Sequence, residues 1–307
     1  MKKTLTGSTA IIATSPLFAN NGWGPLSTNS PKISLAQWSL HRAFEKGMLK
    51  AEDFAAIAAD SYNIQAIEYV NAFYKDFAED QKFWNSMKTR ARDAGVKSLL
   101  IMVDNEGDLG DPNKQKRRDA VQNHYKWIEA AKLLNCHSIR VNAFGSGERK
   151  TLKPNLIEGL GELANYGARL NINVLIENHG LHTSDAVFVT EIINTVDNEY
   201  LGTLPDFGNW CLSAEWGSTQ GGSCTEIYDP YKGVGQMLPF AKGVSAKSYD
   251  FDEDGNETTI DYQKMLRLVK SSKFDGYVGI EYEGRKLSEE AGIRATKNLI
   301  EKIWKEV

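Results

Sequence analysis

Three acidic side chains each follow directly on a short apolar run, and their chemistry depends on where those runs end. Glu177 closes Val-Leu-Ile-Glu, Asp206 closes Gly-Thr-Leu-Pro-Asp, and Glu281 closes Val-Gly-Ile-Glu. If the runs are buried strands whose ends converge, the three carboxylates repel one another and need shared protons or a cation. Oxygen ligands of this kind suit Mg²⁺ or Mn²⁺, and an added imidazole would favour Mn, Co or Zn.

Polar side chains also follow the other apolar runs. A single polar residue after a strand is usually only the solvated start of a loop. A set of polar residues that meets at one end of a barrel of strands is more readily explained as a functional site. The further residues at these positions are Gln37, His41, Glu68, Asn71, Asp104, Arg140, Asn142, Asn178, His179, Lys247 and Glu283.

Apolar runs alternate with amphipathic helical patterns along most of the chain. In residues 50–61, Phe54, Ile57 and Ala58 recur at helical spacing and give one buried stripe. Eight such alternations require parallel strand pairing, because each crossover is a helix. We therefore predict the α/β class and a single (β/α)8 TIM barrel over residues 33–307, with the active site at the C-terminal ends of the strands.

The expected strands are 33–40, 64–70, 96–103, 138–141, 172–176, 201–204, 243–246 and 277–280. The expected helices are 50–61, 79–94, 115–134, 155–170, 184–196, 229–239, 260–272 and 287–305. An open doubly wound sheet is the alternative, but the glycine-rich fingerprint expected after its first strand is missing from residues 38–42.

Four motifs resemble those of the xylose isomerase-like TIM-barrel superfamily of sugar phosphate isomerases and epimerases. They are Ile-Glu-Asn-His-Gly, Pro-Asp-Phe-Gly-Asn, Ser-Ala-Lys-Ser-Tyr-Asp-Phe and Gly-Ile-Glu-Tyr-Glu-Gly, in that order. The resemblance implies that Glu177, Asp206 and Glu281 hold a divalent metal, Mn, Mg, Co or Zn. Ser245 stands where that family usually has a histidine ligand, and Asn209 where it often has a second histidine. Lys247 is the alternative source of positive charge if no metal binds.

The resemblance also implies a sugar isomerase or epimerase that moves a proton next to the carbonyl of a metal-bound keto-sugar. Glu177, Glu281 and Lys247 are then the expected catalytic residues. The expected substrate-binding residues are Trp38, His41, Glu68, Arg140, Asn142, His179 and Asn209. Trp38, Trp210 and Phe73 are candidates to stack on the apolar face of the sugar. The alternatives are a lyase or hydrolase acting on 3-keto-glycosides and a metal-free sugar-binding barrel.

Composition and the N-terminus narrow the partners and the location. The net charge of −4 argues against nucleic acid, and no apolar run is long enough to span a membrane. Lysines, an apolar stretch and small residues predict a signal peptide over residues 1–20, followed by a linker over 21–32. We therefore expect a periplasmic or exported protein, or a cytoplasmic one if this is not a signal. The sequence fixes no oligomeric state, and a homo-oligomer is compatible with it.

The cysteines and one acidic stretch each allow two interpretations. If the chain is exported, Cys211 and Cys224 are able to pair, whereas Cys136 beside an apolar strand is expected to be inert core. The stretch from Asp250 to Asp261 has the spacing of a calcium loop, but its eighth position is charged and its twelfth lacks the bidentate Glu. We expect a turn at the mouth, with Thr258 or Thr259 capping the next helix.

Overall fold

A computed structural model describes residue 1 and residues 30–220 and 224–307. The predicted signal peptide, residues 1–20, and most of the predicted linker, residues 21–32, lie outside these described residues. Within them, no helix is both long and apolar enough to cross a membrane.

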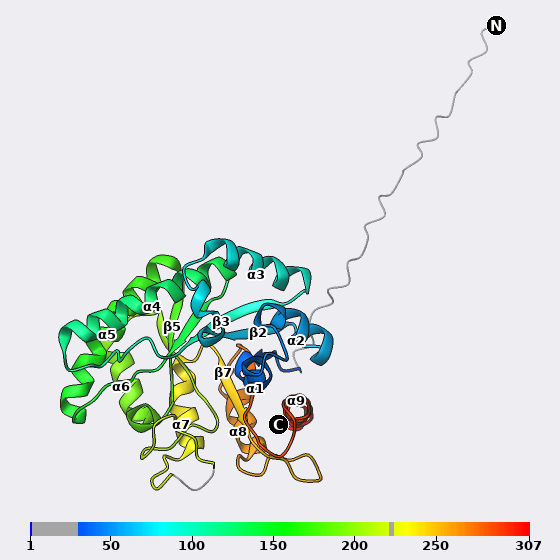
Figure 1. Cartoon of the computed structure of the whole chain (residues 1–307). Coiled ribbons are helices and arrows are strands. Elements are labelled where there is room, and N and C mark those ends of the chain that lie inside the picture. The colour runs from blue at the N-terminus through cyan, green and yellow to red at the C-terminus, as the bar shows by residue number, and fades with distance from the viewer. Residues whose placement is uncertain (2–29, 221–223) are drawn as a thin grey trace.

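Eight parallel strands form the centre of the molecule, as predicted (Figure 1). They are β1 (Ile33–Ala36), β2 (Ala66–Val70), β3 (Lys97–Val103), β4 (Ser138–Val141), β5 (Asn173–Glu177), β6 (Leu201–Leu204), β7 (Val244–Ser248) and β8 (Val278–Tyr282). Pairing runs in the order β6-β5-β4-β3-β2-β1-β8-β7. Beyond the end of β6, Ser245 N donates to Pro205 O and Phe207 N donates to Ser245 O, both at 3.0 Å, so the first and last strands of this order also meet. The predicted TIM barrel is confirmed.

Helices surround the strands, and each crossover contains one (Figure 1). They are α1 (His41–Glu45), α2 (Phe54–Tyr62), α3 (Gln81–Asp93), α4 (Lys114–Leu134), α5 (Arg149–Leu170), α6 (Ala186–Val196), α7 (Pro230–Met237), α8 (Tyr262–Ser271) and α9 (Glu289–Glu306). Acceptor side chains fix several starts: Asp185 accepts from two amides of the first turn of α6, for example. Asn63, Asn135 and Asn171 end α2, α4 and α5 in the left-handed conformation that asparagine tolerates.

Local chemistry moved several predicted boundaries. Residues 37–40 leave the first strand as a 3-10 turn. Helix α5 begins at Arg149, six residues before the start of the helix predicted over 155–170, because Pro154 falls within the helix instead of preceding it. The cap of α8 is Asp261, which accepts from Lys264 N at 2.9 Å, so the expectation of a threonine cap was wrong.

The apolar core has two parts. The larger part lies between the strands and the helices, and the smaller fills the interior of the barrel. The smaller part consists of Ala36, Val70, Leu100, Met102, Leu175 and Leu204, with Trp38, Ala72 and Phe73 packed against it. This plug closes the barrel below the polar residues of the mouth, so those residues rest on a rigid base.

The contact between α7 and Trp210 provides a test of this packing. A Cβ at Gly233 would lie 2.1 Å from the buried indole ring of Trp210, whereas a Cβ at Gly235 of the same helix would meet nothing within 4 Å. We expect Gly233→Ala to lower the free energy of unfolding by about 1–3 kcal/mol through overpacking. Gly235→Ala should leave it unchanged or raise it by up to about 1 kcal/mol. Urea denaturation of both variants measures the difference, and equal effects would contradict the packing described.

Candidate active site

The three carboxylates predicted from the sequence meet at the C-terminal ends of neighbouring strands. Glu177 ends β5, Asp206 follows β6, and Glu281 lies in β8. Oxygen atoms of the three lie within 4.8 Å of one another, and all three side chains are buried. Hard oxygen donors at this spacing fit a divalent cation after a small closure. This cluster is able to bind a metal, and it is the only group of metal-ligand side chains of this kind among the described residues.

Ser245 and Lys247 of β7 stand between Asp206 and Glu281. Ser245 Oγ lies 2.6 Å from Asp206 Oδ2 and 2.8 Å from Glu281 Oε2. The ammonium group of Lys247 lies 3.0 Å from Glu281 Oε1, 3.1 Å from Glu283 Oε1 and 3.8 Å from Asp206 Oδ2. The alternation of strand residues puts both side chains into the barrel, since positions two apart share a face.

The hydroxyl of Ser245 decides where a proton sits. It has one proton and can donate to only one carboxylate, so the other must donate to Ser245 Oγ. Burial raises the pKa of Asp206 to about 7. Burial alone would also raise the pKa of Glu281, but the Lys247 ammonium and the Ser245 hydroxyl hold it below its usual range. Asp206 is therefore the protonated partner near neutral pH, and Ser245 donates to Glu281.

Arg140 holds Glu177 from the other side of the site. Its Nε lies 2.8 Å from Glu177 Oε2, and its Nη1 donates to Asp104 Oδ1 at 2.6 Å. Burial nevertheless raises the pKa of Glu177 well above its usual range, and the charges of Glu281 and Asp206 add to the effect. Each of the two predicted catalytic glutamates thus has its own buried cation, Arg140 or Lys247.

The charges at the mouth do not balance. Five carboxylates face two cations, which leaves an excess of three negative charges; the carboxylates are Asp104, Glu177, Asp206, Glu281 and Glu283. Two protons, on Glu177 and Asp206, would reduce this excess to one, and a divalent cation would do the same. Lys247 does not by itself replace the cation, because Glu283 shares its charge.

The tautomer of His179 follows from its neighbours. Asn142 Nδ2 donates to Asp104 Oδ1 at 2.7 Å, so Asn142 Oδ1 is the atom that faces His179 Nδ1 at 2.6 Å. His179 Nδ1 must then carry the proton, which leaves Nε2 as an acceptor. Burial, with the nearby Arg140, lowers the pKa of His179 to about 3, so the ring is neutral. The carboxylate cluster does not include His179, although it lies 3.8 Å from Glu177 Oε2.

The remaining predicted residues lie at different depths. Asn209 Nδ2 donates to Glu177 Oε1 at 3.5 Å and so belongs to the site. Glu68 lies deeper in the barrel, where it accepts from Ser34 Oγ at 2.6 Å and packs against Gly279. Burial raises the pKa of Glu68 to about 7. No direct contact joins Glu68 to the three carboxylates.

The aromatic residues predicted at the mouth fall into two groups. Trp38 is half-buried and stacks on His41 with ring centres 4.5 Å apart, and Phe73 lies 6.3 Å from Trp38. Trp210 is fully buried beside Tyr228, so it is unable to stack on a ligand at the mouth.

An aromatic residue that sequence reasoning missed is Trp216. Its ring stands edge-on to His179 at 5.1 Å and to Phe144 at 5.7 Å, and it is 42% exposed. Its position in a glycine- and serine-rich loop after β6 was the available signal, because loops at this end of a barrel line the active site.

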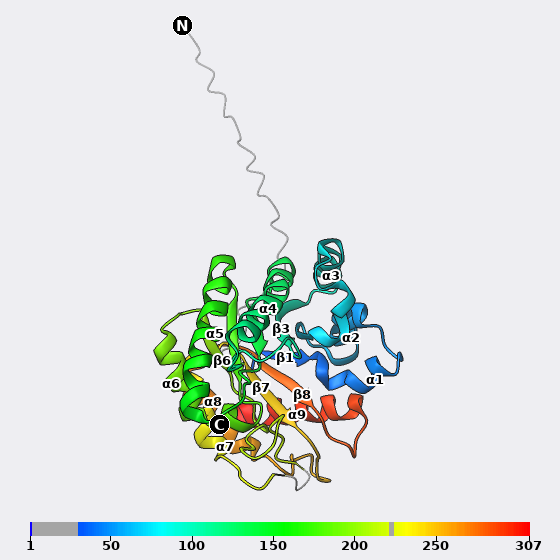
Figure 2. The same cartoon turned by 60° about the vertical axis from the view of Figure 1, so that its left-hand side comes forward.

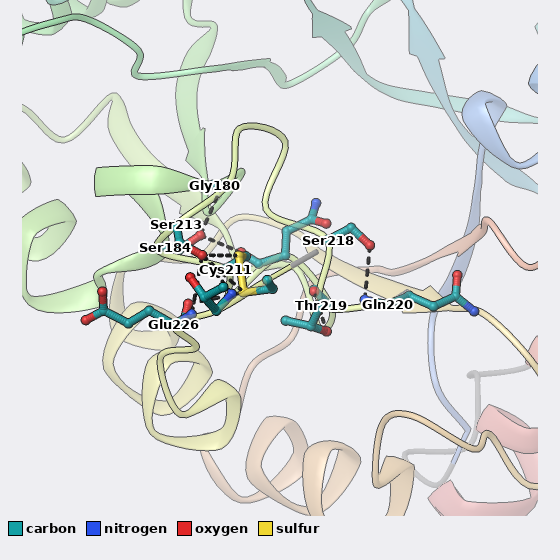
Figure 3. Close-up of a disulfide and its surroundings, with 12 residues drawn as sticks. Gly180, Ser184, Cys211, Ser213, Ser218, Thr219, Gln220 and Glu226 are labelled. Carbon is teal, nitrogen blue, oxygen red and sulfur yellow. Dashed lines mark hydrogen bonds between the residues drawn. A yellow bond between two sulfur atoms is a disulfide. The ribbon is translucent and has the colours of Figure 1, made fainter. Parts of the chain in front are cut away.

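A disulfide closes the loop that carries Trp216. Cys211 and Cys224 are bonded, with Cα atoms 5.7 Å apart, so of the two interpretations that the sequence allowed the structure shows the paired one (Figure 3). Ser213 Oγ accepts from Thr225 N at 2.9 Å beside the bridge, and Cys211 N donates to Gly217 O at 2.9 Å. Cys136 is a buried free thiol, as expected for core.

The acidic stretch after β7 ties the loops of the mouth together and does not gather metal ligands. Asp250 accepts from Gln220 Nε2 at 3.1 Å and lies 3.7 Å from Lys286 Nζ, so it links the loops after β6 and β8. The yellow and orange loops of this part of the chain gather at the lower end of the molecule in Figure 2. Asp252 accepts from the amides of Asp254 and Asn256, which makes a turn. The calcium interpretation has no support in these contacts.

Comparison with known proteins agrees with this architecture. The family model described as xylose isomerase-like TIM barrel matches residues 55–303, and the chain belongs to this family. No curated protein sequence matches the chain.

Several solved structures share the fold. The chain is similar to a 3-keto-D-glucoside 4-epimerase from E. coli, with a TM-score of 0.67 and 12% identity over 89% of this chain and 99% of that one. It is also similar to D-psicose 3-epimerase from Clostridium cellulolyticum, with a TM-score of 0.64 and 11% identity over 90% and 96% of the two chains. A zinc-binding IolI protein gives a TM-score of 0.64 and 14% identity over 90% and 98%. At these identities the likeness establishes the fold alone.

Metal binding should depend on Asp206 and not on the calcium-like stretch. Asp206 Oδ1 accepts from the amides of Gly208 and Asn209, contacts that an asparagine oxygen preserves. We expect Asp206→Asn to fold and to bind Mn²⁺ at least about tenfold more weakly, a loss of about 1.4 kcal/mol. Asp252→Asn should bind like the wild type. Isothermal titration with MnCl₂ measures both, and the reverse pattern would place the metal in the loop.

Protons should compete with the metal. Glu177 and Asp206 both have raised pKa values, so each must lose its proton before it can act as a ligand. Affinity for Mn²⁺ should therefore fall as the pH falls below 7, by about tenfold per pH unit for each displaced proton. Titrations in buffers of different ionisation enthalpy at pH 6 should show about two protons released per ion. Affinity that is independent of pH between 5.5 and 8 would contradict the assigned protonation.

Proposed function

We propose that the protein is a divalent-metal-dependent sugar isomerase or epimerase that moves a proton next to the carbonyl of a keto-sugar. The observation that carries the proposal is the placement of Glu177 and Glu281 on two sides of Asp206, each fixed by its own buried cation. Two oriented carboxylates facing one space suit the removal of a proton and its return.

Glu177, Asp206 and Glu281 would hold the metal, which when bound polarises the substrate carbonyl and stabilises the charge that forms beside it. The all-oxygen ligand set favours Mn or Mg over the softer Co or Zn. Because Ser245 replaces an imidazole ligand, we propose that water completes the shell.

Glu281 is the better base of the two glutamates. Lys247 and Ser245 both stabilise its ionised form, so it is charged and oriented before substrate arrives. Glu177, which is ionised once a metal is bound, would take up a proton from water and deliver it from the opposite side. If the two act on opposite faces of one carbon, the product is an epimer. If one carboxylate shuttles the proton between neighbouring carbons on one face, the product is an aldose–ketose isomer.

Neutral polar groups would orient the hydroxyls of the sugar. His179 Nε2 is a free acceptor for a hydroxyl, and Asn209 and Arg140 offer donors beside Glu177. Trp38 covers the barrel interior on the far side of the mouth, where a sugar ring would stack on it.

A second candidate is elimination from a 3-keto-glycoside. The same deprotonation by Glu281 next to a ketone allows the neighbouring glycosidic oxygen to leave. In the site without metal, the raised pKa of Glu177 favours this candidate, because a protonated Glu177 is suited to protonate the departing oxygen. A metal-free sugar-binding barrel is the remaining alternative.

We also propose that the protein works outside the cytoplasm. The Cys211–Cys224 bridge supports this location, since disulfides persist mainly in oxidising compartments. An exported enzyme would seldom meet sugar phosphates, so the proposed substrate is unphosphorylated.

Deuterium incorporation tests the proton transfer directly. The metal-loaded protein is incubated in D₂O with D-psicose, D-tagatose and a methyl 3-keto-glucoside, and the sugars are followed by NMR. We expect exchange next to the carbonyl, and a loss of about 10²–10⁴-fold in Glu281→Gln and in Glu177→Gln. Thermal unfolding of the variants controls for the fold.

The products separate the candidates. An epimer or isomer supports the first proposal, whereas release of methanol from the methyl glycoside supports elimination. A wild-type protein that binds these sugars but exchanges no deuterium would leave the binding barrel as the answer.

A further inference from the structure

A cavity of about 240 Å³ lies beside the carboxylate cluster at the mouth of the barrel. It takes no part in the proposed proton transfer. The end of β3, the residues after β3 and β4, helix α4 and the loop after β6 form its walls. Val103, His124, Asn142 and Trp216 line it together with three carboxylates, those of Glu106, Asp108 and Glu215. Its volume leaves room for one ring beyond a sugar held at the three carboxylates.

Asn142 and His179 connect this cavity to the catalytic groups. Asn142 lines the cavity and also accepts a hydrogen bond from His179, which in turn lies 3.8 Å from Glu177 Oε2. The Trp216 ring stands 5.1 Å from the His179 ring on the cavity side. A ligand bound at Glu177 that continues past His179 would therefore enter the cavity beside Trp216.

Trp216 is held in place before any ligand arrives. Its backbone is in the left-handed region, with φ of 67°, which costs energy for a residue with a large side chain. The backbone oxygen of the neighbouring Gly217 accepts a hydrogen bond from Cys211 N, directly at the disulfide, and Glu215 forms an isolated β-bridge with Gly180. The indole ring of Trp216 is partly exposed, and its backbone is fixed by these contacts. Such a ring is suited to stack on the apolar face of a sugar ring.

The polar groups of the cavity are mainly acceptors. Asp108 and Glu215 line it, and neither forms an ion pair with any residue that the structure describes. His124 Nδ1 lies 2.7 Å from Ala120 O, so this nitrogen carries the proton and Nε2 is left as an acceptor. Such a lining suits a ligand rich in hydroxyl donors and repels phosphate.

We propose that this cavity is a subsite for a second, uncharged glycosyl unit, so that the substrate is a disaccharide or a related glycoside. The inference rests on the proposed function, because it assumes that the first sugar binds at Glu177, Asp206 and Glu281. It goes further by naming the substrate class: neither a free monosaccharide nor a sugar phosphate fills both sites.

Binding of plain sugars tests the subsite without requiring turnover. Affinities for D-glucose, cellobiose, maltose and gentiobiose are measured by ligand-observed NMR on the full metal-loaded chain. We expect at least one disaccharide to bind about tenfold more tightly than glucose, and Trp216→Ala to remove that advantage while changing glucose affinity less than twofold. Ile227→Ala is the matched control, since Ile227 is exposed on the same loop and does not line the cavity.

The outcomes distinguish the two proposals. If no disaccharide binds more tightly than glucose, or if Trp216→Ala weakens glucose and disaccharides equally, the subsite is wrong even where deuterium exchange occurs. If disaccharides are preferred through Trp216 but no sugar exchanges deuterium, the subsite stands and the proposed proton transfer fails. A second variant, Glu215→Gln, should also reduce the disaccharide preference, by about threefold or more for a lost charge-assisted hydrogen bond. An unchanged preference in that variant would argue against the acceptor-rich wall.

Discussion

The excess of negative charge at the mouth is the constraint on which the rest of the site depends. Buried carboxylates repel one another strongly, and Arg140 and Lys247 neutralise only part of that repulsion. The barrel fold holds these carboxylates close together despite their repulsion. The ends of its eight strands converge at one mouth, and the apolar residues beneath that mouth form a rigid base. The remaining charge has to be met by protons or by a divalent cation. That requirement links the protonation of Asp206 to metal affinity and to the choice of base.

Side chains behind the carboxylates preserve this geometry. Asn178 is fully buried and joins the ends of β5 and β6: its amide donates to Asp206 O at 3.0 Å and to Asn209 O at 3.1 Å, while its oxygen accepts from Asp206 N at 2.8 Å. Two neighbouring strand ends are thereby locked to each other through one side chain. Asn178 therefore keeps Glu177 and Asp206 close together, in positions from which both carboxyl groups can reach one ligand.

The features that follow from the alternation of apolar strands and amphipathic helices could be predicted from the sequence. The features that depend on contacts between residues far apart in the sequence could not. Each apolar run with a terminal polar residue was visible, so all eight strands and the three carboxylates were found. Pairing of Cys211 with Cys224 was also foreseeable from two cysteines flanking one loop. Trp210 and Trp216 show the limit, since both lie between β6 and α7 and only tertiary packing buries Trp210 against Gly233 and leaves Trp216 at the mouth. The start of α5 was misplaced because Pro154 lies inside the helix, at its sixth residue, where the sequence gives reason to expect a helix boundary instead.

Ser245 does more than remove a possible imidazole ligand, because its hydroxyl also connects Asp206 to Glu281. An imidazole in its place would leave Asp206 and Glu281 without a shared hydroxyl, and the two would depend on a cation to stay close. With Ser245, a proton on Asp206 and a hydrogen bond to Glu281 complete a satisfied network in which a cation has to compete. A cation that binds here would have to displace the proton on Asp206, so its affinity should depend on pH in the neutral range.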